Sequence, residues 1–284
     1  GILAGMDSLV TTQWLADHLG DPDLVVLDCS VIHVVDESNR LHFTSGRSEY
    51  DAGHIPTAGF ADLTGELCDP DSRLRFALPT PERFCQAMGA LGVGDDSRVV
   101  LYDSSIAAWA ARVWWMLRWV GFDRAALLDG GIGLWKAEGR QLSTEPATAL
   151  PAQLTIRLRP KVVASHDETL QATNDDGVCI VDSMTAEHYR GEVKMYSRTG
   201  HLPGSVNVPM RDLLDESGRF RPPDELAQLH NTDPNARTIT YCGGGIAASA
   251  SAFAMHRLGF EDVAVYTASL QEWTADPNSP LVVP

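Results

Sequence analysis

The sequence predicts an α/β protein of two similar domains, each built on a mostly parallel β-sheet flanked by helices. Two observations carry this prediction. Short apolar runs of β-prone residues alternate along the chain with longer segments of helical pattern, which is typical of parallel sheets covered by helices. The same order of segments and motifs then recurs in the second half, which indicates a duplicated domain.

The repeat is carried by motifs that lie at nearly constant spacing. The recurring residues are His54 and His201 in Gly-His-Ile/Leu-Pro, Gly121 and Gly259 in Gly-Phe, and Trp135 and Trp273. Such a long period indicates two whole domains and not a solenoid of short units. We expect an N-terminal domain at 7–143, a linker rich in Pro, Thr and Ala at 144–159, and a C-terminal domain at 160–284.

Within each half, individual elements follow from local pattern. Continuous apolar runs predict strands buried on both faces, at 24–28, 98–103 and 125–130 in the first half and at 178–182, 238–242 and 263–267 in the second. A Pro-led segment at 81–93 and an apolar segment at 107–122, which closes on Gly121, predict helices. His54, His201, Trp135 and Trp273 recur in both halves, so we interpret them as structural.

Composition narrows the functional classes. The chain has 284 residues, 44% hydrophobic and 21% charged, as in a soluble globular protein. Its 22 Lys+Arg against 38 Asp+Glu give a net charge of −16, which disfavours nucleic-acid and membrane partners. There is no apolar run long enough for a spanning helix. The start lacks signal-peptide features, and residues 1–5, before Met6, are interpreted as an expression remnant.

The five cysteines are an odd number, scattered, and without a C-x-x-C pair. This spacing argues against a disulfide framework or a zinc site and predicts a reducing, cytoplasmic location. No metal is expected.

One cysteine lies in a context that predicts chemistry. A β-prone run ends on Cys242, three glycines follow, and a small-residue segment then has helical pattern. Backbone N–H groups at a helix start lack intrahelical partners and, with the helix dipole, favour a thiolate over a thiol. We therefore expect Cys242 to be a nucleophile held by converging backbone amides. These are the amides of Gly243, Gly244, Gly245, Ile246 and Ala247.

The first half supplies an internal control. The residue that corresponds to Cys242 is Asp103, in "LYDSSIAAW". A carboxylate cannot perform thiol chemistry, so we expect one active site per chain, in the C-terminal domain. The N-terminal domain is predicted to be catalytically inactive.

A strand–Cys–loop–helix is also typical of cysteine phosphatases, which need an Arg six residues after the cysteine to bind phosphate. That position is Ala248, and the loop "GGGIA" carries no cation. Phosphatase activity is therefore disfavoured. A neutral amide loop suits a persulfide better, because its charge is less concentrated.

The whole ordered set of motifs resembles the tandem-domain rhodanese family of thiosulfate and 3-mercaptopyruvate sulfurtransferases. The matching stretches are "GRSEYDAGHIPTAGFADL", "RVWWMLRWVGF", "LLDGGIGLW", "RTGHLPGSVNVP", "YCGGGIAAS" and "LQEW". The resemblance implies an inactive N-terminal domain and a catalytic cysteine that carries sulfur as a persulfide. It implies transfer to cyanide or to a thiol such as reduced thioredoxin, with neither metal nor organic cofactor.

The donor-binding residues match the family only in part. The family's Ser or Thr in the cysteine loop is Gly244 here, and the histidine that would accompany it falls near Phe76, while the family's aspartate is matched by Asp62. The resemblance places the candidates for binding an anionic donor at His188, Arg190, Arg198 and Asp62. Ser269 of the family's last motif is retained.

We therefore expect a sulfurtransferase that uses double displacement at Cys242. The absence of an acid side chain at Gly244 favours thiosulfate, whose sulfite leaves as a stable anion, with 3-mercaptopyruvate as a second donor. The alternative is a non-catalytic sulfur carrier or partner-binding protein in which donor recognition has been lost.

Overall fold

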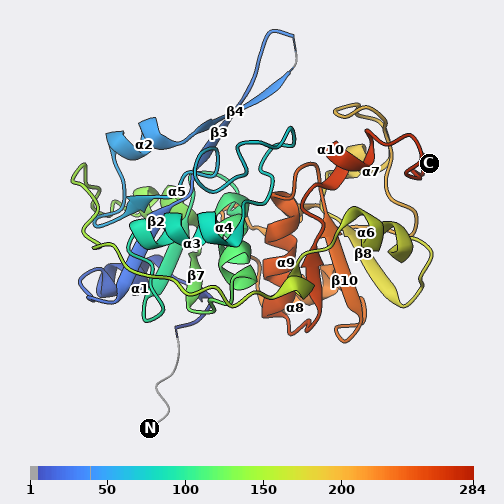
Figure 1. The fold of residues 1–284 in the computed structure, drawn as a ribbon. Helices are drawn as coiled ribbons and strands as arrows, with labels where there is room; N and C mark the ends of the chain where they lie inside the picture. Colours follow the sequence, from blue (N-terminus) through green and yellow to red (C-terminus); the bar gives the residue numbers. More distant parts are fainter. Residues whose placement is uncertain (1–5, 39) are drawn as a thin grey trace. The chain divides into compact units, whose positions relative to one another are not determined.

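The computed structural model describes residues 6–38 and 40–284 of the chain (Figure 1), and the interpretation of residues 1–5 lies outside them. Two compact units are formed. The first contains the described residues up to Asp71, then Leu78–Leu158 and Glu216–Arg219; the second contains Ser72–Ala77, Arg159–Asp215 and Phe220–Pro284. Most of the expected linker therefore groups with the first unit, where Ala152 N donates to Gly89 O and Arg157 N to Val120 O, both over 2.8 Å.

The first unit is built on a five-stranded sheet in which all pairings are parallel. Its strands, in spatial order, are β1 (Leu9–Val10), β7 (Ala125–Leu128), β6 (Arg98–Tyr102), β2 (Leu24–Asp28) and β5 (Gly59–Phe60). All five residues of β2 are buried, as the continuous apolar run predicted. The helices are α1 (Thr12–His18), α2 (Arg47–Ala52), α3 (Pro81–Ala90), α4 (Ala108–Trp119) and α5 (Gly131–Ala137).

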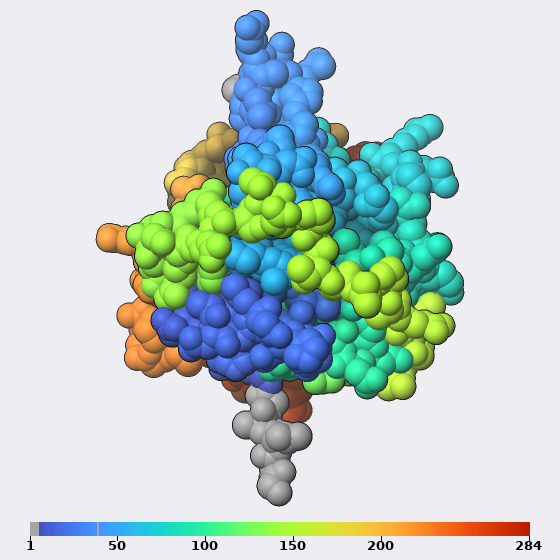
Figure 2. All heavy atoms as spheres, turned by 90° about the vertical axis from the view of Figure 1, so that its left-hand side faces the viewer, coloured from blue at the N-terminus to red at the C-terminus, as the bar shows by residue number. Residues whose placement is uncertain are grey.

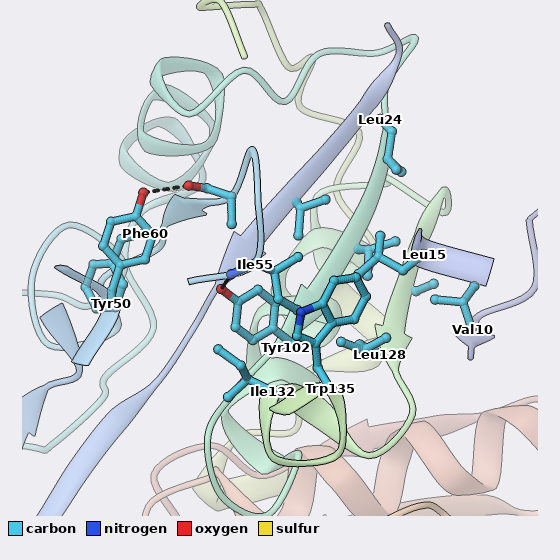
Figure 3. Close-up of a cluster of buried hydrophobic side chains, with 14 residues drawn as sticks. Val10, Leu15, Leu24, Tyr50, Ile55, Phe60, Tyr102, Leu128, Ile132 and Trp135 are labelled. Atoms are coloured by element: carbon cyan, nitrogen blue, oxygen red, sulfur yellow. Dashed lines mark hydrogen bonds between the residues drawn. The ribbon is translucent and has the colours of Figure 1, made fainter. Parts of the chain in front are cut away.

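Local sequence explains where the helices begin. Thr80 precedes α3 and its side chain accepts a hydrogen bond from Arg83 N, while Pro81 occupies the first turn. Helix α4 is buried along almost its whole length, including Arg112, whose guanidinium lies 4.8 Å from the Trp115 ring. Figure 3 shows a buried cluster of the first unit in which Trp135 lies beside Tyr102. The Tyr102 hydroxyl accepts a hydrogen bond from Ile55 N over 3.2 Å.

A hairpin of β3 (Val31–Val35) and β4 (Leu41–Ser45) is the one antiparallel sheet of the described residues. It projects from the rest of the first unit (Figures 1 and 2) and leaves Val34 and Val35 about half exposed. The periodicity of the sequence did not predict it.

The second unit repeats the plan with a four-stranded parallel sheet. Its strands, in spatial order, are β11 (Val263–Val265), β10 (Arg237–Tyr241), β8 (Val178–Asp182) and β9 (Val206–Asn207). The helices are α6 (His166–Ala172), α7 (Ala186–Tyr189), α8 (Pro223–Leu229), α9 (Ala247–Arg257) and α10 (Ser269–Trp273), with short 3₁₀ turns η1 (Pro160–Val162) and η2 (Met210–Leu213). The predicted α/β class is confirmed.

Membrane-crossing helices are not found among the described residues, since none is both long and apolar enough.

A buried aspartate closes the same strand in both units. Asp28 ends β2 and Asp182 ends β8, and burial raises the pKa of each to about 6. Asp182 accepts hydrogen bonds from the Tyr241 hydroxyl over 2.5 Å and from Met184 N over 2.8 Å. Because the ordinary value is 3.8, the folded protein binds these two protons more tightly than the unfolded chain does.

This difference predicts the sign of a pH effect on stability. Tighter proton binding by the two carboxyls stabilises the folded protein. This stabilisation is fully present below about pH 4 and is lost as the pH rises through about 6. Between those values, the melting temperature of the Asp28→Asn/Asp182→Asn double variant should vary less steeply with pH than that of the native chain. Unchanged slopes would contradict the raised pKa values.

Candidate active site

Cys242 lies directly after β10, in the loop that leads to the first turn of α9. Its side chain is buried, with 3% of the residue exposed, and Gly245 N donates to Cys242 Sγ over 3.1 Å. The loop is therefore the strand–cysteine–amide–helix arrangement that the sequence predicted. Its sulfur accepts a hydrogen bond from one backbone N–H of the loop at a helix start, where further N–H groups lack intrahelical partners.

The three glycines after Cys242 are needed for different reasons. Gly245 has φ +86°, a conformation that favours glycine, and this turns its N–H toward the sulfur. Gly243 has no room for a side chain, since a Cβ there would overlap Tyr196 Oη and lie 2.8 Å from Tyr196 Cζ. Gly244 has room, because the nearest atom to its Cβ position is Gln271 Nε2 at 3.4 Å.

A second turn fixes the backbone of Cys242 from the other side. Ser269 Oγ accepts from Cys242 N over 3.1 Å and donates to Tyr266 O over 2.7 Å, while Leu270 N donates to Cys242 O over 3.0 Å. Ser269 has φ +54°, which is unusual for a residue with a side chain. Its hydroxyl therefore positions the cysteine through the backbone.

The first unit contains the same construction around a carboxylate. Asp103 is 3% exposed, and its carboxylate accepts from Ser105 N, Ala107 N and Ala110 N over 3.0–3.1 Å. Ile132 N donates to Asp103 O just as Leu270 N donates to Cys242 O. Burial raises the pKa of Asp103 and the amide donors act in the opposite direction. The duplicated loop thus binds an anionic side chain with its amides.

A short segment from the first half of the sequence belongs to the second unit and reaches the cysteine loop. In Ser72–Ala77, the backbone of Arg75 makes two hydrogen bonds of 2.9 Å with the side chain of Gln271. Gln271 N in turn donates to Gly243 O over 3.0 Å. Burial raises the pKa of Tyr196, a negative charge on Cys242 would raise it further, and the positive charge of Arg75 lowers it, so both side chains lie close enough to act on the hydroxyl beside the loop.

The sequence-derived candidates for donor binding have different surroundings. Arg198 donates to the carbonyls of Trp273, Thr274, Asp276 and Ser279 over 2.6–3.4 Å, so its guanidinium is engaged in holding the chain. Arg190 is exposed and pairs with Glu192 over 3.0 Å.

His188 and Asp62 also have partners. His188 Nδ1 shares a hydrogen bond of 2.6 Å with Thr185 Oγ1, its Nε2 is buried with no partner in the described residues, and burial lowers its pKa. Asp62 belongs to the first unit, where it accepts from Thr64 N and Thr64 Oγ1 and lines a cavity with Arg47 and Phe60. Their roles in donor binding stay predictions.

The duplicated histidines have structural contacts. His54 stacks on Tyr50 with ring centroids 4.0 Å apart and bonds to Tyr50 O and Glu145 O, and His201 stacks on Tyr189 at 3.7 Å and bonds to Tyr189 O. These contacts agree with the structural role inferred from their recurrence.

Sequence reasoning missed Tyr196, Arg75 and Gln271. Tyr196 lies where the two copies differ in length, so the repeat gives no partner for it, and Arg75 lies far from Cys242 in the sequence. All five cysteines are free thiols. In residues 6–38 and 40–284, no three His, Cys, Asp or Glu side chains gather in a way that could hold a metal ion.

The rhodanese-like domain matches residues 11–138 and 165–276, so the chain belongs to the rhodanese family. It is an enzyme of the sulfurtransferase class.

Similar proteins cover almost the whole chain. A probable 3-mercaptopyruvate sulfurtransferase of Pseudomonas aeruginosa is 37% identical over 96% of this chain and 97% of its own length. A thiosulfate sulfurtransferase of Rattus norvegicus is 32% identical over 94% and 91%. The crystal structure of the 3-mercaptopyruvate sulfotransferase SseA from Escherichia coli superimposes with a TM-score of 0.82 at 30% identity, covering 93% of this chain and 99% of that one.

Proposed function

We propose that Cys242 takes the outer sulfur from a small anionic donor, carries it as a persulfide and passes it to an acceptor. Both thiosulfate and 3-mercaptopyruvate are proposed as donors, since relatives are named for each. Cyanide or a thiol such as reduced thioredoxin is proposed as the acceptor. The thiolate attacks the donor, the desulfurised anion leaves, and the acceptor then attacks the persulfide.

The observation that carries the proposal is the pair of loops. In the first unit, the amides of Ser105 and Ala107 bind the Asp103 carboxylate. Their counterparts in the second unit are Gly244 N and Ile246 N, for which the described residues provide no acceptor. A terminal persulfide sulfur adds one anionic atom beyond Sγ, and these two amides would be its donors.

The surroundings of the loop also support sulfur over phosphate. No residue from Gly243 to Ala247 is charged, and Ala248 stands at the position of the phosphatase arginine. The loop residues themselves would therefore offer a phosphate dianion only backbone amides. The persulfide carries a single negative charge, which this loop can accommodate.

The test is formation of thiocyanate from cyanide, run in parallel with thiosulfate and with 3-mercaptopyruvate. Turnover with both donors is expected, together with its loss in Cys242→Ser and a mass increase of one sulfur atom on Cys242 when the acceptor is omitted. A folded protein that forms the persulfide but does not turn over with either donor would instead be a sulfur carrier. Turnover that survives in Cys242→Ser would contradict the proposal.

A further inference from the structure

The hydroxyl of Tyr196 occupies the place of a side chain in the cysteine loop. As a Cβ at residue 243 would overlap Tyr196 Oη, the hydroxyl stands beside the residue that follows Cys242. The Tyr196 ring also packs against the buried cluster of the second unit that includes Tyr266 and Trp273. Packing of the ring therefore keeps the Tyr196 hydroxyl beside the loop.

Among the residues the structure describes, the Tyr196 hydroxyl has no hydrogen-bond acceptor. Other tyrosines do have one: Tyr50 donates to Ala58 O, Tyr189 to Ser205 O and Tyr241 to Asp182 Oδ2, over 2.5–2.7 Å. Burial and the charge of Cys242 both raise the pKa of Tyr196. The phenol thus stays protonated at neutral pH and keeps its O–H available for a bound molecule.

The segment that carries Tyr196 is anchored two residues after the tyrosine by Arg198. Arg198, two residues later, donates to Asp276 O over 2.7 Å and to Ser279 O over 2.6 Å. Because these hydrogen bonds occupy the guanidinium of Arg198, it holds the chain in place and is not available to a substrate. A hydrogen-bond donor that is held in position before the reaction needs little reorganisation when negative charge develops next to it.

The two proposed donors make different demands on such a group. With 3-mercaptopyruvate, Cys242 Sγ bonds to the donor sulfur, the sulfur–carbon bond breaks, and its electron pair forms the enolate of pyruvate. The proton of the former thiol then passes from the persulfide to that carbon. With thiosulfate, the sulfur–sulfur bond breaks and the electron pair leaves on sulfite with no proton transfer. The first route builds negative charge on an enolate oxygen, and the side chains of the loop itself have no donor to stabilise it.

We propose that Tyr196 is a catalytic residue whose hydroxyl donates a hydrogen bond to the enolate oxygen of 3-mercaptopyruvate as sulfur moves to Cys242. The inference rests on the proposed function. It assigns to a tyrosine outside the loop the task that Gly244 cannot perform. It also explains how a loop without an acid side chain serves a donor that leaves as an enolate.

The test compares Tyr196→Phe with Tyr189→Phe, which removes a hydroxyl elsewhere in the same unit. For Tyr196→Phe, kcat with 3-mercaptopyruvate should fall about ten- to a hundredfold. With thiosulfate, kcat should change by less than about threefold, because no enolate forms on that route. Tyr189→Phe should not change the ratio between the donors. Melting temperatures are measured for all proteins.

The outcomes separate this inference from the proposed function. Equal losses on both donors would mean that Tyr196 only shapes the loop, and no loss on 3-mercaptopyruvate would mean that it does not touch the leaving group; either result overturns the inference. In both cases, persulfide formation and its loss in Cys242→Ser still report on the proposed function. A selective loss with 3-mercaptopyruvate supports the assignment.

Discussion

Replacing Gly243 by alanine is expected to lower kcat/KM about a hundredfold with either donor, because displacing a reacting group by about an ångström has effects of this size. The new methyl group would overlap Tyr196 Oη and lie 2.8 Å from Cζ. Either the ring must leave its place or the loop must shift, and both movements displace the backbone next to Cys242. Steady-state turnover and persulfide formation on Cys242 measure the effect.

Gly244→Ala is the matched control. It adds the same methyl group one residue further on, where the nearest atom is Gln271 Nε2 at ordinary contact distance, and Gly244 does not have a positive φ. Activity should stay within about threefold of the native value on the same reasoning. Equal losses in the two variants would show that the loop is sensitive to any side chain and not to the Tyr196 contact.

A double variant identifies the contact itself. In Gly243→Ala/Tyr196→Ala, the ring that collides with the methyl group is absent, so the loop can return to its native path. Persulfide formation from thiosulfate should then recover relative to Gly243→Ala, even though turnover of 3-mercaptopyruvate stays low. The interaction between the two substitutions is non-additive because the residues are in contact.

The sequence was sufficient for features that are local or duplicated. The strands that lead to Asp103 and Cys242, the helices that follow these two residues, and the parallel sheets were predicted from apolar runs and repeated motifs, although the two strands end one residue earlier than predicted, at Tyr102 and Tyr241. Membership of the rhodanese family is confirmed by the match over both halves. In these features, the signal and its structural consequence lie within a few residues of each other.

Features that depend on tertiary contact could not be predicted. The reason for Gly243 is a tyrosine far along the chain, and Arg75 reaches the loop only because Ser72–Ala77 packs with the second unit. Arg198 was a candidate donor-binding residue because it is a cation near a family motif, whereas the carbonyls that occupy it come from 273–279. Pattern gives the residue type, but only the fold gives its partners.

Replacing Asp103 by alanine is expected to destabilise the protein by about 3 kcal/mol, because it leaves several buried amides without an acceptor. The N–H groups of Ser105, Ala107 and Ala110 converge on this carboxylate, which is almost fully enclosed. Asp103→Asn should destabilise the protein less than Asp103→Ala because it retains one oxygen as an acceptor, and more than no change because its NH₂ group faces amides that need acceptors. Denaturant unfolding should give a free energy of unfolding that decreases from the native protein to Asp103→Asn and then to Asp103→Ala. A loss below about 0.5 kcal/mol in Asp103→Ala, the size typical of surface substitutions, would contradict the prediction.

This series tests the physical basis of the catalytic loop without the chemistry. Asp103 and Cys242 occupy the same point of a duplicated strand–loop–helix, and both receive hydrogen bonds from the loop amides. In the first unit the carboxyl group is a permanent part of the chain, so the strength of its binding appears in folding stability. In the second unit, the proposed charge is the terminal sulfur of the persulfide, so the same amides would act only during turnover. A large effect at Asp103 therefore supports the amide loop as an anion site, whereas a negligible effect would leave the persulfide to be stabilised by other groups.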